Sequence, residues 1–258
     1  MGFVLRADEG PVRTLTLNRP ESRNALNVAL LRALRAELRA ACEAQGVRCL
    51  LLAGAGKAFC AGADVKEWAE QGPQEEPSAW VAEAHALVLE LVDSPLPTVA
   101  VLNGATVGAG LDLALACDFR VAARDARFAC AYTWMAYPPD AGGTWLLPRL
   151  VGLEQAKRFV YTGEFWDAET ALSRGLVTQV VAPERLREAA AELAQLLASG
   201  PTVAIGHAKR LLAGSELRPL AEQLERERLA SEACVLTEDH REALAAAAEK
   251  RKPVFVGR

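Results

Sequence analysis

The sequence predicts an α/β protein with largely parallel strands, followed by a region that is helical throughout. Short apolar strands alternate with helical stretches up to about Pro183, an order typical of parallel sheets whose strands are connected by crossover helices. Beyond that point the chain is rich in Ala, Leu, Glu and Arg, which favour helices. Its 258 residues, 51% of them hydrophobic, are enough to bury an ample core.

The expected elements follow one another with turn signals between them. Residues 12–17 alternate like a strand, residues 18–24 form a turn, and residues 27–42 carry leucines at helical spacing on one side. Further strands are expected at residues 49–52, 98–102, 119–122 and 177–181. C-terminal helices are expected near residues 184–198, 202–213, 219–233 and 238–250. Residues 71–78 are polar and are expected to form a loop or lid.

Composition excludes several classes of function. The formal net charge is −4 and no dense basic block occurs, which argues against nucleic acid as the main partner. No signal peptide and no apolar run of the ~18 residues that a membrane span needs are visible. The six cysteines form no CxxC pair and the three histidines are scattered, so we expect reduced thiols, a cytoplasmic location and no metal site.

The most informative stretch is AVLNGATVGAGLDLALACD, residues 100–118. It runs from an apolar strand through three glycines in seven residues into an apolar segment of helical period. A strand, a glycine-rich turn and a helix start direct backbone N–H groups and the positive end of a helix dipole at one point. In a pocket, that point can hold an oxygen that gains negative charge.

Together with this stretch, TLTLNRPESRNALN (14–27), AGAGKAFCAGADVKEW (53–68), PPDAGGTWLLPRLVG (138–152) and the ending EKRKPVFVGR identify the chain as resembling the crotonase (enoyl-CoA hydratase/isomerase) family. The resemblance implies a crotonase-like spiral of ββα units over residues 1–195, which binds and transforms an acyl-CoA thioester. It further implies a C-terminal helical region, residues 196–258, that packs in a homotrimer or a dimer of trimers.

The resemblance also implies a set of binding positions. The oxyanion-hole donors are the backbone amides of Ala63 and Ala109. The family usually has Gly where Ala109 stands, and Ala keeps the N–H. Asp64 and Glu67 are also spaced like a helix N-cap and its N3 partner. The positions that match those around the coenzyme A moiety are Arg23, Ala25, Ala61, Asp64 and Val65.

The proton-moving positions depart from those of the family's hydratases, which carry two glutamates. The matching residues here are Asp112 and Tyr132. Asp is one methylene shorter than Glu, and Tyr, with an ordinary pKa of about 10, is a poor base at neutral pH. Asp140, in PPDAGGTW, resembles the acid/base of the phenylacetate-pathway isomerases, an acid of the dienoyl-CoA isomerases and the nucleophile of 4-chlorobenzoyl-CoA dehalogenase. His85 matches a histidine of that dehalogenase and is on this ground a candidate substrate-binding residue.

Each of these residues has a simpler interpretation. Asp112 falls in the first turn of a helix, where acids are common, and Asp140 suits a turn. Tyr132 suits a pocket wall, and His85 lies in the apolar helical run AEAHALVLELV.

The leading hypothesis for the function is double-bond isomerisation of an enoyl-CoA without a cofactor, coenzyme A entering only as part of the substrate. Asp140, helped or replaced by Asp112, moves the proton, and Tyr132 is a third catalytic candidate. The alternatives are hydration or dehydration, hydrolytic or dehalogenating attack by Asp140 on an aryl-CoA, and a non-catalytic or RNA-associated CoA-binding member of the family.

Overall fold

A six-stranded sheet forms the base of the computed structural model, which describes residues 2–71 and 79–258. Its order is β1-β2-β3-β5-β7-β10, and neighbours pair in parallel except β1 and β2, which form an antiparallel hairpin. The predicted α/β class is therefore confirmed. The strands are β1 (Val4–Glu9), β2 (Val12–Leu17), β3 (Cys49–Gly54), β5 (Thr98–Leu102), β7 (Phe119–Ala123) and β10 (Gln179–Val181).

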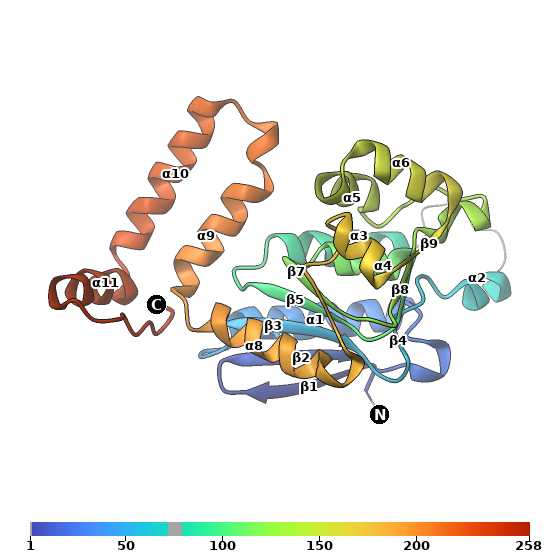
Figure 1. Cartoon of the computed structure of the whole chain (residues 1–258), viewed down its shortest axis with the longest axis horizontal. Helices are drawn as coiled ribbons and strands as arrows, with labels where there is room; N and C mark the ends of the chain where they lie inside the picture. Colours follow the sequence, from blue (N-terminus) through green and yellow to red (C-terminus); the bar gives the residue numbers. More distant parts are fainter. Residues whose placement is uncertain (1, 72–78) are drawn as a thin grey trace.

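A second sheet of four short strands stands beside the first, in the order β4-β6-β8-β9 (Figure 1). Its strands are β4 (Ala58–Cys60), β6 (Ala105–Val107), β8 (Arg127–Ala129) and β9 (Phe165–Asp167). β3, β5 and β7 each continue through a short turn into β4, β6 and β8, and helices follow each pair. This repetition is the expected spiral of ββα units.

Two glycines allow the backbone to pack closely around the turn between β3 and β4. A Cβ at Gly104 would lie 2.1 Å from the carbonyl oxygen of Lys57, and one at Gly54 would lie 2.4 Å from that of Ala58. Any larger residue would have to move backbone, which is costly in a packed interior.

Helices cover both faces of the first sheet. On one face lie α1 (Val28–Glu43) and α3 (Ala79–Val92), and on the other lies α8 (Leu186–Ala198). Alternate side chains of β3 point to opposite faces of the sheet. Leu50 and Leu52 pack in the cluster with α1 and α3, whereas Cys49 and Leu51 pack in the cluster with α8. This division follows from the period of two in a strand.

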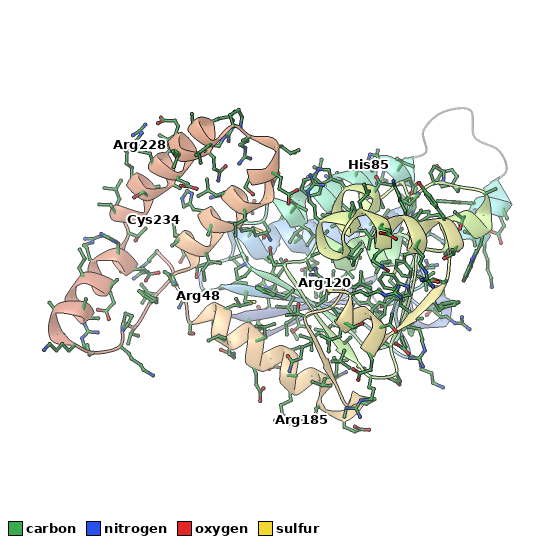
Figure 2. All side chains as sticks on the ribbon, turned by 45° about the horizontal axis from the view of Figure 1, so that its top comes forward. Arg48, His85, Arg120, Arg185, Arg228 and Cys234 are labelled. Atoms are coloured by element: carbon green, nitrogen blue, oxygen red, sulfur yellow. The ribbon has the colours of Figure 1, made fainter. Side chains whose placement is uncertain are left out.

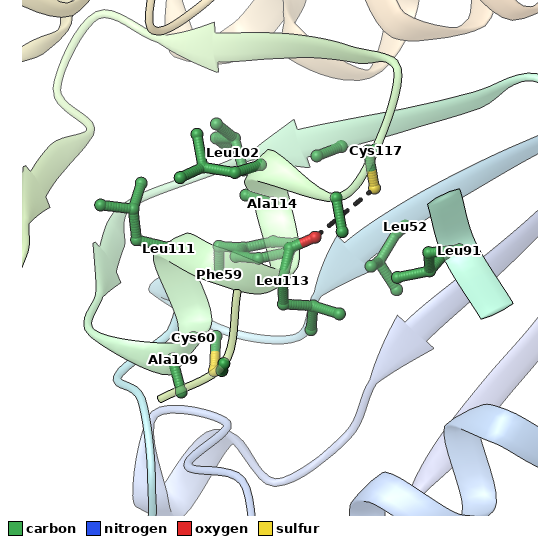
Figure 3. Close-up of a cluster of buried hydrophobic side chains, with 14 of the residues drawn as sticks. Leu52, Phe59, Cys60, Leu91, Leu102, Ala109, Leu111, Leu113, Ala114 and Cys117 are labelled. Carbon is green, nitrogen blue, oxygen red and sulfur yellow. Dashed lines mark hydrogen bonds between the residues drawn. The ribbon is translucent and has the colours of Figure 1, made fainter. Parts of the chain in front are cut away.

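The remaining helices of the body are α2 (Val65–Gln71), α4 (Ala109–Leu115), α5 (Gly143–Val151), α6 (Leu153–Thr162) and α7 (Ala168–Ser173). Short 3₁₀ turns are η1 (Pro20–Ser22), η2 (Ala131–Met135), η3 (Pro183–Arg185) and η4 (Ser215–Leu217). Every residue of α4 is buried. Its leucines pack with Phe59 and Leu102 in the main core, and Figure 3 draws Cys60 beside Ala109 at the start of the helix.

The C-terminal helices form an arm, α9 (Thr202–Ala213), α10 (Leu220–Val235) and α11 (Glu238–Glu249), that projects from the body. Figure 2 shows Arg228 and Cys234 on this arm, whereas His85 lies on the body. Arg48 joins the two, because its guanidinium donates to Thr202 and to the carbonyl of Phe255 at 2.7 Å. The arm leaves large apolar side chains exposed, among them Leu212, Leu220, Leu224, Leu229, Val235, Leu236 and Leu244.

Most of the expected long elements are confirmed with small changes at their ends. β2, β5 and α9 have the predicted bounds. α1 buries Leu30, Leu31, Leu34 and Leu38 as predicted. The expected domain boundary at residue 195 falls inside α8 and stays a prediction. Of the expected polar loop, residues 72–78 lie outside the described residues, and α2 extends through residue 71.

All six cysteines are free, and four of them are buried. Among residues 2–71 and 79–258, no group of three or more potential ligands is arranged to hold a metal ion. No helix in the same part of the chain is long and apolar enough to cross a membrane.

We predict that Asn24→Ala lowers the free energy of unfolding by about 2–4 kcal/mol. Asn24 is fully buried, and its amide nitrogen donates to the carbonyls of Ala55, Ala58 and Phe59. Removing the donor leaves these buried acceptors unpaired, and the φ of +57° suits Asn better than Ala. Urea unfolding measures the change.

The control is Asn18→Ala, which removes an exposed hydrogen bond to the carbonyl of Gly2 and is expected to cost less than about 0.5 kcal/mol. Equal losses in the two variants would contradict a special role for Asn24.

Candidate active site

The turn from β6 into α4 places the N–H of Ala109 at the start of a buried helix. Gly108 has φ +54° and ψ −127°, a conformation that favours glycine. Its N–H donates to the carbonyl of Ala129, and its own carbonyl accepts from Leu111 and Asp112. Ala109 is the first residue of α4, and in the described part of the chain no backbone carbonyl accepts from its N–H. Such an N–H is available to a ligand.

The second predicted donor, Ala63, lies in a one-residue parallel bridge to Leu26. Leu26 donates to the carbonyl of Gly62 at 2.7 Å and accepts from Asp64 at 3.1 Å. Ala63 lies between Gly62 and Asp64, the two residues that bond Leu26. In a parallel bridge, the N–H of such a residue points away from the partner strand. A Cβ on Gly62, whose φ is +95°, would lie 3.5 Å from the nitrogen of Ala109. The segments that carry the two predicted donors are therefore in contact.

The Asp64 side chain stabilises the start of α2. One carboxylate oxygen pairs with the guanidinium of Arg19 at 2.9 Å, and the other accepts from the N–H of Glu67 at 3.4 Å. The same Arg19 nitrogen donates to the carbonyl of Ala25 at 2.6 Å. The cap predicted from the spacing of Asp64 and Glu67 is therefore present. Both carboxylate oxygens of Asp64 therefore have hydrogen-bond or ion-pair partners within the protein.

The other positions predicted around coenzyme A gather at the same bridge. The N–H of Ala61 donates to the carbonyl of Arg23 at 3.0 Å, and Ala25 is buried directly before Leu26. Arg23 and Val65 are exposed at the surface on either side. The structure thus brings these positions together, and their contact with coenzyme A stays a prediction.

Asp112 and Tyr132 form a buried pair. The Tyr132 hydroxyl donates to Oδ2 of Asp112 at 2.5 Å, and the Asp112 side chain is fully buried. Burial raises the pKa of Asp112 to about 7, and the negative charge of Asp140 adds to the rise. The Tyr132 hydroxyl and the backbone N–H groups of Gly143 and Ala141 oppose it. Burial and the Asp112 charge raise the pKa of Tyr132 far above its ordinary value, so Tyr132 acts as a hydrogen-bond donor and not as a base.

Asp140 lies close enough to this pair to influence the pKa of both partners. Burial raises its own pKa, and the His85 charge and the Tyr137 hydroxyl oppose the rise. His85 does not reach the carboxylate by a hydrogen bond. Its Nε2 lies 2.7 Å from the backbone carbonyl oxygen of Asp140, which can only accept a proton. His85 therefore anchors the backbone of the loop that carries Asp140.

Two carboxylate oxygens in this region are buried without a hydrogen-bond partner, Oδ1 of Asp112 and Oδ2 of Asp140. A buried carboxylate oxygen is normally satisfied, so each is available to a substrate group or a water. The structure therefore brings the three predicted catalytic candidates into one region, and their catalytic roles stay predictions.

Three residues that frame this region were not singled out from the sequence. Arg19 and Asn24 support the loop around Ala63, because the Asn24 side chain accepts from the N–H of Arg19 at 2.9 Å and holds the turn after β3. Tyr137 lies near enough to Asp140 for each to affect the other's pKa, and its ring centre lies 6.5 Å from that of Trp68 on α2. Only the turn signal around Asn24 was visible in the sequence.

Comparison with known proteins places this geometry in a family. A sequence model of the enoyl-CoA hydratase/isomerase family matches residues 8–258. The 1,2-epoxyphenylacetyl-CoA isomerase of Escherichia coli is 38% identical over 261 residues, covering all of both chains. The 2,3-dehydroadipyl-CoA hydratase of the same organism is 37% identical over 263 residues, again covering all of both chains. One isomerase and one hydratase thus resemble this chain at nearly the same identity.

Solved structures agree with this assignment. The enoyl-CoA hydratase of Bacillus anthracis superposes with a TM-score of 0.93 at 37% identity, covering 99% of this chain and 100% of that one. A Pseudomonas aeruginosa protein is 50% identical, with a TM-score of 0.83 over 88% of this chain and 98% of its own. The chain, with its spiral of ββα units and its glycine turn at the start of α4, is an enzyme of the enoyl-CoA hydratase/isomerase (crotonase) family.

Proposed function

We propose that this enzyme moves a double bond along the acyl chain of an enoyl-CoA thioester. The observation that carries the proposal is the pair of buried aspartates, Asp112 and Asp140, each with one unpartnered carboxylate oxygen. They lie in one region with Tyr132, where the family's hydratases have the second of two glutamates. Isomerisation needs a group that takes a proton from one carbon and a group that returns one to another, and it requires neither a held water nor a cofactor.

The backbone N–H groups of Ala63 and Ala109 hold the thioester oxygen. When a proton leaves the α or γ carbon, charge moves onto that oxygen, and two N–H donors stabilise it. The contact between the Gly62–Ala63 segment and the N-terminus of α4 supports this assignment. So does the lack of an acceptor for the Ala109 N–H in the described backbone.

Asp140 is the principal acid/base, and Asp112 assists it. Asp140 is half-buried, and its raised pKa makes it a better base than an exposed aspartate. Asp112, with a pKa of about 7, is protonated in a large fraction of molecules at neutral pH. A carboxylate and a carboxylic acid near one enolate can therefore act together.

Hydration of an enoyl-CoA is the second candidate. The same unpartnered oxygens, Oδ1 of Asp112 and Oδ2 of Asp140, suit a water molecule held between the two carboxyls. Hydration of crotonyl-CoA removes the enoyl absorbance, whereas isomerisation of a 3-enoyl-CoA creates it. The two reactions are therefore separated by the sign of one optical change.

We further propose a homotrimer or a dimer of trimers built on the C-terminal arm, working in the cytoplasm. Leu220 at the start of α10 is 72% exposed, and Leu236 directly after α10 is 79% exposed. Apolar surface of this kind is typical of an interface between subunits. Sedimentation velocity measures the assembly.

We predict that Asp140→Asn lowers kcat for isomerisation by about 10²- to 10⁴-fold, the range typical of a positioned acid/base. The measurement is NMR of several 3-enoyl-CoA chain lengths in D₂O, which follows both double-bond migration and uptake of deuterium. The matched control is Asp125→Asn, which removes one exposed carboxylate in the turn after β7 and keeps full activity. If the native enzyme shows neither migration nor deuterium uptake with any chain length, the proposed function is wrong.

We predict that Ala109→Pro lowers kcat by about 10²- to 10³-fold, since it removes one donor to the thioester oxygen. Proline is tolerated at the first residue of a helix, and Ala109 holds that place in α4. The control is Glu238→Pro at the first residue of α11. Thermal unfolding of both variants is measured alongside. Loss of activity in both, or in neither, would contradict the oxyanion role.

A further inference from the structure

The Asp112 carboxyl is held differently at its two oxygens. Oδ2 accepts from the Tyr132 hydroxyl at 2.5 Å, whereas Oδ1 is buried with no partner of hydrogen-bond geometry. Tyr132 is itself only 8% exposed, so solvent does not compete for its hydroxyl. One oxygen of the carboxyl is therefore occupied, and the other is left for a proton or a ligand.

The surroundings restrict rotation of this carboxyl. α5 begins at Gly143, and a Cβ on that residue would lie 2.2 Å from Oδ1 of Asp112. The carboxyl thus lies with Oδ1 against the backbone of Gly143 and with Oδ2 on the Tyr132 hydroxyl. A turn of the carboxyl would break the 2.5 Å hydrogen bond to Tyr132. The backbone N–H groups of Gly143 and Ala141 also favour the charged carboxylate, but neither makes a hydrogen bond of normal geometry to Oδ1.

We propose that Tyr132 is a positioning residue that fixes Asp112 so that Oδ1 exchanges the proton, and that Asp112 and Asp140 divide the two proton transfers of the isomerisation. This inference rests on the proposed function, and it assigns one transfer to each carboxyl.

The Asp140 carboxylate takes a proton from one substrate carbon, and the electron pair of that C–H bond delocalises onto the thioester oxygen. The resulting dienolate takes the proton from Oδ1 of Asp112 at the other carbon, with its electron pair forming the new C–H bond. Asp112 is left as a carboxylate with Oδ2 still bonded to Tyr132, and Asp140 is left protonated. Exchange of one proton with solvent at each carboxyl restores the resting enzyme.

The charges around Asp112 agree with this division. In the described residues, the titratable groups that act on it or respond to its charge are Tyr132, Asp140 and Cys130. Burial raises the pKa of Cys130 to about 12, so its thiol is neutral. Two buried carboxyls that repel each other favour a state with one proton between them at neutral pH. One acid and one base are then ready in the same molecule.

The test removes the Tyr132 hydroxyl and follows the Asp112 carboxyl itself. Tyr132→Phe is compared with Tyr161→Phe, which removes the same hydroxyl from a ring that is 70% exposed. The carboxyl titration is recorded on the enzyme without substrate, by infrared difference spectroscopy assigned with Asp112→Asn. Loss of a hydrogen bond to a charged group shifts the Asp112 pKa upward by about one to two pH units.

The activity profile supplies a second measurement. Asp112 must be protonated to act as the acid, so kcat falls at high pH, and Tyr132→Phe moves that basic limb upward by the same one to two units. It also lowers kcat about 10- to 100-fold at neutral pH, since a positioned acid contributes about that much or more. Tyr161→Phe changes neither. If Tyr132 were purely structural, Tyr132→Phe would lower the stability of the protein without shifting the basic limb of the kcat profile.

If Tyr132→Phe does not fold, 3-fluorotyrosine at position 132 replaces it. Its more acidic hydroxyl strengthens the hydrogen bond and shifts the Asp112 pKa downward. If the pKa of Asp112 is unchanged both in Tyr132→Phe and with 3-fluorotyrosine at position 132, the positioning role is wrong. A product that keeps most of the substrate's own hydrogen in D₂O overturns the division between two carboxyls. If the titration shifts but no 3-enoyl-CoA is isomerised, the positioning of Asp112 stands and the proposed function fails.

Discussion

The entry of the chain from β6 into α4 is the constraint on which the site depends. Gly108 turns the backbone with a positive φ, and its carbonyl accepts the first bonds of the helix, from Leu111 and Asp112. Because this turn fixes the helix start, it also fixes the Ala109 N–H and, one turn later, the Asp112 carboxyl. One backbone conformation thus sets both the Ala109 N–H and the Asp112 carboxyl, and their relative positions cannot change independently.

The burial of α4 changes the acidity of the Asp112 carboxyl. Every side chain of the helix is buried, so an aspartate in its first turn loses solvation that the helix dipole and the Tyr132 hydroxyl only partly replace. The result is a carboxyl whose pKa is about 7, in contrast to the low pKa of the exposed Asp167 at the start of α7, where hydrogen bonds to Thr170 dominate. Both aspartates stand at or near helix starts. Their different surroundings raise the pKa of the buried Asp112 and lower that of Asp167, which caps α7.

The sequence made the long elements predictable because their apolar periods are long enough to read. α1 and β2 show this well, whereas β4, β6, β8 and β9 have three residues each, too few to show a period. β1 was missed because all but its first residue are exposed, so it lacks the alternation of a half-buried strand. The Asp112, Tyr132 and Asp140 positions were found through the resemblance. Their hydrogen bonds were not, because partners such as His85 and Asp140 lie 55 residues apart.

The family resemblance alone does not choose between isomerase and hydratase, since one relative of each kind resembles this chain at nearly the same identity. The choice depends on what replaces the second glutamate. A glutamate pair can hold a water by two carboxylates, but Tyr132 directs its only polar hydrogen at Asp112 and not at a ligand. That hydrogen bond withdraws one carboxylate oxygen from any water while leaving the other for proton exchange. A site with two aspartates, and with a tyrosine whose hydroxyl is bonded to one of them, therefore loses more capacity to hold water than capacity to move protons. This difference is the physical argument for proposing isomerisation rather than hydration.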